Sequence, residues 1–238
     1  MQNKVNIIFD LDDTILDFKK GAQEGLENIL KQYPVPDVRF DEWLKVFNVV
    51  NRDVWREIEA GGSPKEWLDT RFSTTYEQFN VKQDGVLLES AYRSLLDENF
   101  YLIEGAEVLL NHLKEQGYTL IAGTNGQSST QRKRLKGTGL DQIFDEVIIS
   151  DEVGVAKPDP RFFKKLFNQS KEITPENTVM IGDSLRSDIQ GAINAGITSV
   201  WFNPLKLDNQ TNIKPDYEVD SYDALEQLLT ADSLQYAK

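Results

Sequence analysis

Val5-Asn6-Ile7-Ile8-Phe9-Asp10-Leu11-Asp12-Asp13-Thr14 is the stretch of sequence that decides the fold. Its apolar first half predicts a buried strand, and three carboxylates follow within four positions at the carboxyl end of that strand. Clustered carboxylates repel one another unless they share a cation. By itself the stretch is equally typical of a reactive site and of an acidic surface turn in which Thr14 caps the next helix. The rest of the chain has to distinguish the two.

The composition limits the possible partners. The chain has 238 residues, of which 39% are hydrophobic, so it can form a substantial core. Its net charge of −13 argues against a nucleic-acid polymer or an anionic membrane as a partner, because both select a basic surface. An anionic substrate would need a metal ion or a few well-placed cations to neutralise its charge locally. The sequence leaves a monomer and a homodimer equally open.

Cysteine and histidine usage excludes several kinds of chemistry. There are no cysteines, so disulfides, thiolate nucleophiles and cysteine-bound metals are excluded. The single histidine, His112, excludes multi-histidine metal sites, and its amphipathic helical context predicts a surface or boundary position. The amino terminus has no secretory pattern, and no apolar run approaches the roughly 18 residues of a membrane span. We therefore expect a cytoplasmic protein.

The apolar periodicity divides the chain into two parts. Residues 17–100 show only helical spacing, which predicts a small four-helix domain inserted after the first strand. Residues 1–16 and 101–238 alternate between strand and helix patterns, which is typical of an α/β fold with a Rossmann-like parallel sheet and helices on both faces. Later strands are expected at residues 118–122, 146–149, 178–181, 198–202 and, more weakly, 217–219. The tail from Thr230 is expected to fray.

In a parallel sheet, ligands bind outside the carboxyl ends of the strands, and three further segments near strand ends carry reactive groups. Thr124-Asn125-Gly126 offers a hydroxyl, an amide and backbone N–H groups before a helix, which suits an anion. Lys157 lies in a stiff turn between Gly154 and Pro158. Gly182-Asp183 repeats the opening pattern, with Asp188 five residues later. Each segment alone is also typical of an ordinary turn or loop.

Together the four segments supply what phosphoryl transfer requires. They also resemble the four motifs of the haloacid dehalogenase superfamily: an Asp-x-Asp-x-Thr, a strand-end Ser or Thr, a Lys, and a Gly-Asp with further acids. All four occur here in order, and the resemblance covers nearly the whole chain. The helical insert is similar to the α-helical cap of that superfamily's first cap class. The resemblance implies a phosphomonoester as the substrate and Mg²⁺ as the cofactor.

The resemblance also implies a role for each acid of the opening stretch. Asp10 would be the nucleophile, forming an aspartyl-phosphate, and Asp12 the general acid and base. Thr14 would orient Asp12. Asp13 has no family role, and a structural one suits it best.

The remaining motif residues would hold the phosphoryl group and the metal. Thr124, Asn125 and Lys157 would bind the phosphoryl group, with Lys157 also counted as catalytic. Asp10, the Asp12 backbone carbonyl and Asp183 would bind Mg²⁺, and Asp188 would support them from behind. Two carboxylates and a carbonyl, completed by water and phosphate oxygens, form the all-oxygen shell that Mg²⁺ prefers.

The reaction type follows from Asp12. A halide leaving group needs no proton, so an acid at this position indicates phosphate chemistry. Residues 181–196, with Trp201-Phe202-Asn203 and Thr124-Asn125-Gly126, resemble the bacterial noncanonical pyrimidine nucleotidase branch and imply a 5'-nucleotidase. The alternatives are a phosphoglycolate or sugar-phosphate phosphatase, a phosphomutase that shares these motifs, and, remotely, a binding module without catalysis.

Substrate selection is expected to depend on the helical insert. Its side chains that are candidates for contacting a substrate are Phe18, Lys19, Trp55, Arg56 and Arg71. Three of the four tryptophans lie in this insert, where large aromatic side chains most simply fill the core of a small bundle.

Overall fold

The computed structural model describes residues 5–230 of the chain. The chain forms two compact units, one made of residues 1–17 and 102–238 and the other of residues 18–101. The frayed tail that we expected after Thr230 lies outside the described residues. No helix within residues 5–230 is long and apolar enough to cross a membrane.

The first unit contains a six-stranded parallel sheet, as the alternating pattern predicts. Its strands follow the order β3-β2-β1-β4-β5-β6. Their bounds are β1 (Asn6–Phe9), β2 (Thr119–Thr124), β3 (Glu146–Ile149), β4 (Thr178–Gly182), β5 (Thr198–Phe202) and β6 (Tyr217–Val219). The opening strand β1 lies at the centre and pairs with β2 on one side and β4 on the other. The strands that lead into Asp10, Thr124 and Asp183 are therefore neighbours in the sheet.

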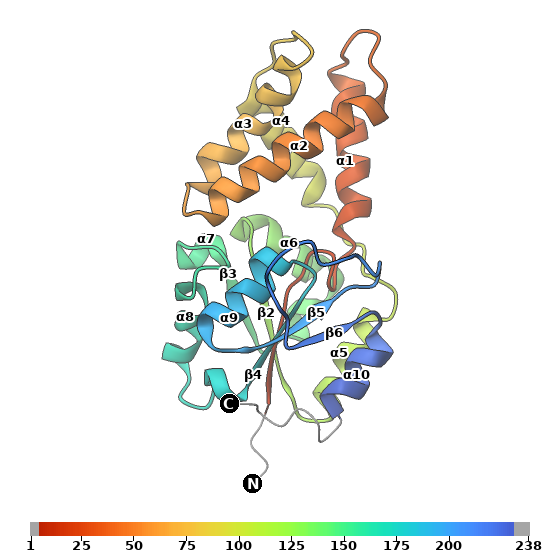
Figure 1. Cartoon of the computed structure of the whole chain (residues 1–238). Coiled ribbons are helices and arrows are strands. Elements are labelled where there is room, and N and C mark those ends of the chain that lie inside the picture. The colour runs from red at the N-terminus through yellow and green to blue at the C-terminus, as the bar shows by residue number, and fades with distance from the viewer. Residues whose placement is uncertain (1–4, 231–238) are drawn as a thin grey trace. The chain divides into compact units, whose positions relative to one another are not determined.

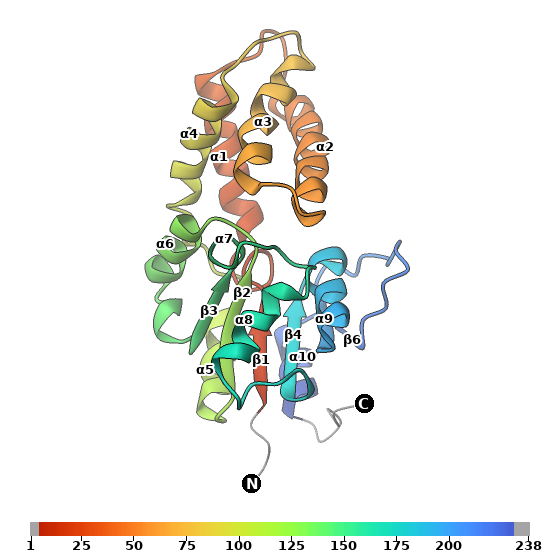
Figure 2. The same ribbon diagram turned by 90° about the vertical axis from the view of Figure 1, so that its left-hand side faces the viewer.

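Helices cover both faces of this sheet (Figures 1 and 2). Because successive side chains of a strand point to opposite faces, Ile7 and Phe9 join one core and Ile8 the other. The first core is covered by α5 (Ala106–Glu115), α6 (Ser128–Thr138) and α10 (Tyr222–Thr230). The second is covered by α8 (Arg161–Gln169) and α9 (Gln190–Ala195). His112 lies on α5 at the surface, as predicted, with its side chain about half exposed and 3.5 Å from Glu226.

The second unit is entirely helical within its described elements. These are α1 (Phe18–Gln32), α2 (Phe40–Glu59), α3 (Pro64–Glu77) and α4 (Gly85–Leu96). Trp43 is fully buried and stacks on Phe47, with 5.3 Å between ring centroids. Trp67, by contrast, is 37% exposed. Core filling therefore accounts for Trp43 and leaves Trp67 largely at the surface.

Two local features differ from the pattern-based expectation. Strand β2 continues through Gly123 to Thr124, so the predicted anion-binding hydroxyl belongs to the last residue of the strand. The helix expected over 184–195 starts with a π-helical turn over Leu185–Ile189 before α9 begins. Such turns add one residue to the helical repeat and are frequent at functional sites. Here the turn carries Asp188 into the site.

Candidate active site

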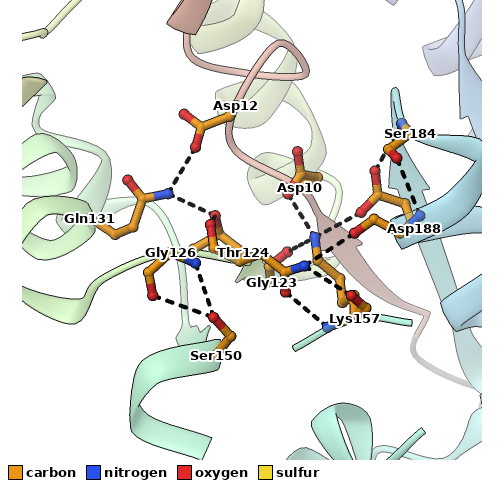
Figure 3. A network of polar contacts seen from close by, with 12 residues as sticks. Asp10, Asp12, Gly123, Thr124, Gly126, Gln131, Ser150, Lys157, Ser184 and Asp188 are labelled. Carbon is orange, nitrogen blue, oxygen red and sulfur yellow. Dashed lines mark hydrogen bonds and ion pairs between the residues drawn. The ribbon is translucent and has the colours of Figure 1, made fainter. Parts of the chain in front are cut away.

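The carboxyl ends of β1, β2 and β4 bring the predicted residues together (Figure 3). The Asp10 backbone N–H donates to the Ile181 carbonyl at 2.8 Å, which extends the β1–β4 ladder to the start of the acidic loop. Asp183 follows β4 directly, and Thr124 ends β2 on the other side of β1. Lys157 comes from the loop between α7 (Ser150–Val153) and α8.

Lys157 is the cation at the centre of the site. Its side chain is 1% exposed, and its Nζ donates to Asp10 Oδ1 at 2.7 Å, Asp188 Oδ1 at 2.7 Å and the Gly123 carbonyl at 2.6 Å. Burial alone would lower the pKa of the ammonium, but the charges of Asp10 and Asp188 outweigh it and raise the pKa above its ordinary value. Lys157 therefore stays protonated in this environment.

Asp10 has an excess of negative charge around it. Burial raises the pKa of its carboxyl well above the ordinary value, and although Lys157 lowers it, Asp188, Asp183 and Asp12 add to the increase. One ammonium thus faces several carboxylates in a poorly solvated place. A further cation would relieve this imbalance.

The same carboxylates suit a divalent cation. Asp10, Asp183 and Asp188 each offer a carboxylate oxygen, and these oxygens lie within 4.8 Å of one another. Hard oxygen donors of this kind are what Mg²⁺ binds. Asp188 already accepts from Lys157 with Oδ1 and from the Ser184 N–H with Oδ2 at 3.0 Å, so much of its capacity is used within the protein. The donor set of these three carboxylates fits Mg²⁺.

Gly182 allows Asp188 to reach this position. A Cβ atom on Gly182 would lie 2.2 Å from Asp188 Oδ2, a distance that real side chains do not tolerate. The glycine of the Gly-Asp motif is therefore required by the close approach of the following π-helical turn.

Asn125 and Thr124 have different surroundings. The Asn125 amide accepts from the Lys157 backbone N–H at 2.8 Å and donates to the Lys157 carbonyl at 2.9 Å, with a longer contact to Ser187 Oγ at 3.3 Å. We predicted that this amide binds phosphate, but here both of its ends hold the Lys157 backbone. The Thr124 hydroxyl is buried and accepts from Gln131 Nε2 at 2.7 Å.

Asp12 is held by two residues that we did not anticipate from the sequence. Gln131 Nε2 donates to its Oδ2 at 3.0 Å, and Arg134 Nη1 donates to its Oδ1 at 2.5 Å. Both donors belong to α6, whose buried positions are mainly polar. The polar composition of this helix did not point to them, because polar residues of a helix are normally solvated. We expected Thr14 to orient Asp12, but the Thr14 hydroxyl is buried without a hydrogen-bond partner among residues 5–230.

The contacts of Asp13 and Arg71 indicate structural roles. Asp13 adopts a left-handed backbone conformation, with φ of 59°, and its N–H donates to the Leu16 carbonyl at 2.8 Å. Arg71 is buried within the helical unit, where its guanidinium donates to both Glu89 oxygens at 2.6 and 2.9 Å and to Asn51 at 3.0 Å. Arg71 was named above as a candidate substrate contact, but these bonds commit it to the core of its own unit.

The sequence model of the haloacid dehalogenase-like hydrolases matches residues 7–202. The chain belongs to the haloacid dehalogenase-like hydrolase family. It is 37% identical over 230 residues to the pyrimidine 5'-nucleotidase PynA of Streptococcus pneumoniae, covering 96% of each chain. It is 34% identical over 224 residues to the pyrimidine 5'-nucleotidase YjjG of Escherichia coli, covering 94% of this chain and 96% of that protein.

A solved relative in the same family agrees with the fold. The crystal structure of the putative hydrolase YfnB from Bacillus subtilis, described as bound to magnesium, matches with a TM-score of 0.87 and 34% identity. The match covers 97% of this chain and all of that one. The predicted family and nucleotidase branch, and the α/β fold, are therefore confirmed.

Proposed function

We propose that this hydrolase is a Mg²⁺-dependent 5'-nucleotidase that dephosphorylates pyrimidine nucleoside monophosphates through an aspartyl-phosphate. The observation that carries the proposal is the position of Asp10, which lies at the end of the central strand and 2.7 Å from a buried, protonated lysine. The high similarity to two pyrimidine 5'-nucleotidases over nearly the full chain supports the substrate class.

In the first step a carboxylate oxygen of Asp10 attacks phosphorus, and the bond from phosphorus to the nucleoside 5'-oxygen breaks. Asp12, when protonated, gives its proton to that departing oxygen. The Thr124 hydroxyl donates to a phosphoryl oxygen, and the positive charge of the Lys157 ammonium offsets the charge that develops on the phosphoryl group. The products are the free nucleoside and a phosphoryl group on Asp10.

In the second step Asp12, now ionised, takes a proton from water. The resulting hydroxide oxygen bonds to phosphorus, the bond to Asp10 breaks, and inorganic phosphate leaves. Dividing one difficult displacement into two easier ones is the advantage of a covalent intermediate. A single carboxyl serves as acid and then as base, so it has to stay in one place through both steps.

Asp10 and Asp183, with the Asp12 carbonyl, would hold Mg²⁺. Asp188 would support them through its hydrogen bonds from Lys157 and the Ser184 N–H. The ion would supply positive charge that reduces the repulsion between a carboxylate nucleophile and a phosphate dianion. The helical unit of residues 18–101 would act as the cap that selects the substrate.

The catalytic part of the proposal is tested with Asp10→Asn. We expect it to abolish hydrolysis of 4-nitrophenyl phosphate with an unchanged circular dichroism spectrum, because the amide is not a nucleophile. Asp13→Asn is the matched control, since Asn also accepts the left-handed conformation, and it should keep most of the activity. EDTA should abolish the activity of the wild type and Mg²⁺ should restore it. Wild-type turnover by the Asp10 variant would refute the mechanism.

The aspartyl-phosphate intermediate is tested by measuring how it divides between reaction with water and reaction with methanol. Added methanol competes with water for a common phosphoryl-enzyme, so the ratio of methyl phosphate to inorganic phosphate should be the same whichever substrate is used. A ratio that changes with the leaving group would argue for direct attack by water.

The substrate class is tested with a panel of dUMP, dTMP, UMP, purine nucleotides, phosphoglycolate and sugar phosphates. We expect the highest kcat/KM for the pyrimidine nucleotides. Equal or higher values for phosphoglycolate or a sugar phosphate would move the chain to another phosphatase class while leaving the chemistry intact.

A further inference from the structure

We propose that Gln131 and Arg134 of α6 are positioning residues, which fix the Asp12 carboxyl for proton transfer and set the direction of the Thr124 hydroxyl. We call this pair the α6 clamp. The inference rests on the proposed function, because it assigns a purpose to residues around the proposed acid and base.

The α6 clamp holds Asp12 at both oxygens. Arg134 Nη1 donates to Oδ1 at 2.5 Å, and Gln131 Nε2 donates to Oδ2 at 3.0 Å. Arg134 Nη1 also donates to Gln131 Oε1 at 2.8 Å, so the two clamp side chains fix each other. A carboxyl bound at both oxygens loses its freedom to rotate, and such orientation of a reacting group is a large part of catalysis.

The α6 clamp also acts on Thr124. The amide of Gln131 has two hydrogens, and Nε2 reaches both Asp12 Oδ2 and Thr124 Oγ1, as Figure 3 shows. Because the Thr124 oxygen accepts from Gln131, its single hydrogen points elsewhere. Its only recorded donation among the described residues is a long one, 3.3 Å, to the adjacent Asn125 carbonyl. The hydroxyl is therefore presented as a donor, which is what a phosphoryl oxygen requires.

The composition of α6 argues against a purely structural role. The Arg134 side chain is 1% exposed, and burying a guanidinium is costly unless it is paired. A leucine or methionine at this position would pack the helix on the sheet without that cost. Its partner Asp12 is 28% exposed and would be solvated without the arginine. A contribution to folding stability therefore explains the Arg134–Asp12 ion pair poorly, whereas the need to hold the Asp12 carboxyl in place explains it well.

Leaving-group dependence separates a positioning role from a structural one. Phenolate is a much stronger base than 4-nitrophenolate, so hydrolysis of phenyl phosphate depends far more on a placed acid. Asp12→Asn provides the reference for complete loss of the acid, with kcat/KM measured on both substrates. We expect Arg134→Met to lower kcat/KM for phenyl phosphate about 100-fold and for 4-nitrophenyl phosphate less than about 10-fold. In the Asp12→Asn background, Arg134→Met should not change the ratio further.

Two more variants keep the test decisive if Arg134→Met folds poorly. Arg134→Lys keeps the charge and should recover part of the loss on phenyl phosphate. Gln131→Met leaves the Arg134–Asp12 pair intact, so it should fold. It should shift the ratio in the same direction and also raise the inhibition constant of inorganic phosphate several-fold, because it releases Thr124 as well.

The results of these variants distinguish a failure of the clamp inference from a failure of the proposed function. If Arg134→Met and Gln131→Met lower kcat/KM by equal factors for the two substrates, the α6 clamp acts only on the fold and the inference is wrong. If Asp12→Asn shifts the ratio and neither clamp variant does, the inference is also wrong and the proposed function stands. If Asp12→Asn itself leaves the ratio unchanged, Asp12 is not the acid, and both the mechanism and the clamp are refuted.

Discussion

Asn125 offers a direct test of how the lysine of this site is held. Its side-chain amide makes two hydrogen bonds to the backbone of Lys157, at 2.8 and 2.9 Å, and ties the end of β2 to the loop that carries the ammonium. Each bond is worth about 1 kcal/mol net, so Asn125→Ala should lower the free energy of unfolding by about 2 kcal/mol.

The rate should fall as well. Lys157 Nζ has to meet Asp10, Asp188 and the Gly123 carbonyl within 2.6 to 2.7 Å, and this loop is what places it there. A displacement of about 1 Å in a catalytic group costs about 100-fold in rate. We therefore expect Asn125→Ala to lower kcat by about that factor. Lys157 itself is unchanged in this variant, so the loss would report its placement.

Two companion variants separate the contacts of Asn125. Asn125→Asp keeps the shape and the acceptor for the Lys157 N–H, but it puts a second oxygen against the Lys157 carbonyl. It should be at least as destabilising as the alanine variant at pH 7. Ser187→Ala removes only the 3.3 Å contact and should stay within about 0.5 kcal/mol of the wild type. Urea denaturation followed by circular dichroism gives the free energies, and steady-state kinetics on 4-nitrophenyl phosphate gives kcat.

The result that would refute this reasoning is specific. If Asn125→Ala unfolds within about 0.5 kcal/mol of the wild type and raises the inhibition constant of inorganic phosphate about tenfold, the amide binds the phosphoryl group directly. The sequence-based prediction that Asn125 binds the phosphoryl group would then be right, and its two hydrogen bonds to Lys157 would contribute little to stability.

Two further predictions concern ion pairs away from the reacting groups. Arg132 donates to Glu152 and lowers the pKa of its carboxyl to about 2, so the stability that this ion pair adds is present above the ordinary pKa near 4.5 and is lost as the pH falls towards 2. In urea denaturation, Glu152→Gln should therefore lower the free energy of unfolding by about 1 kcal/mol at pH 7 and leave it unchanged near pH 2. An equal loss at both pH values would contradict the assignment. In the helical unit, Arg71→Met should cost about 3 kcal/mol, because it removes the bidentate partner of the buried Glu89 and leaves that carboxylate with Arg93 at 3.0 Å. The double variant with Glu89→Leu should return to within about 1 kcal/mol of the wild type, because Arg93 is partly exposed, and tryptophan fluorescence during urea denaturation would detect a failure of that recovery.

The positions of the main site residues were predictable because a parallel sheet imposes them. Strand β1 contains the apolar run Ile7-Ile8-Phe9, which ends at Asp10, and β4 repeats the pattern before Asp183. Once the two strands are neighbours, with Phe9 paired to Ile181, the acids that follow them lie at one edge. Periodicity predicts the strand end that carries each acid, whereas the adjacency of β1 and β4 comes from the structure. No side-chain geometry is required.

The α6 clamp was not predictable in the same way. Arg134 is 122 positions from Asp12 in the chain, and in a polar helix an arginine is normally solvated. Only the packing of α6 against the sheet turns that face inward and removes it from water. The Thr14 hydroxyl, which we expected to orient Asp12, makes no hydrogen bond among residues 5–230 for a related reason. The two residues are close in sequence, but Thr14 turns into the interior and Asp12 turns towards α6.

The acidic loop then explains how two carboxyls only two residues apart acquire different roles. The Leu11 carbonyl accepts from the N–H groups of Ile15 and Leu16 at 2.9 and 2.7 Å, and Asp13 takes the left-handed conformation that closes this turn. The turn leaves Asp10 facing Lys157 and leaves Asp12 facing Arg134.

Different cations and different exposure, 11% for the Asp10 side chain against 28% for Asp12, give the two carboxyls separate electrostatic environments. Such a separation is the general basis on which paired carboxyls divide nucleophilic and proton-transfer work. Lys157 serves a group that has to stay close to phosphorus, and Arg134 serves one that has to exchange a proton with the solvent side. The backbone turn at Asp13 is therefore as much a part of the proposed mechanism as the reacting side chains, because it separates the two carboxyls and directs each towards its own cation.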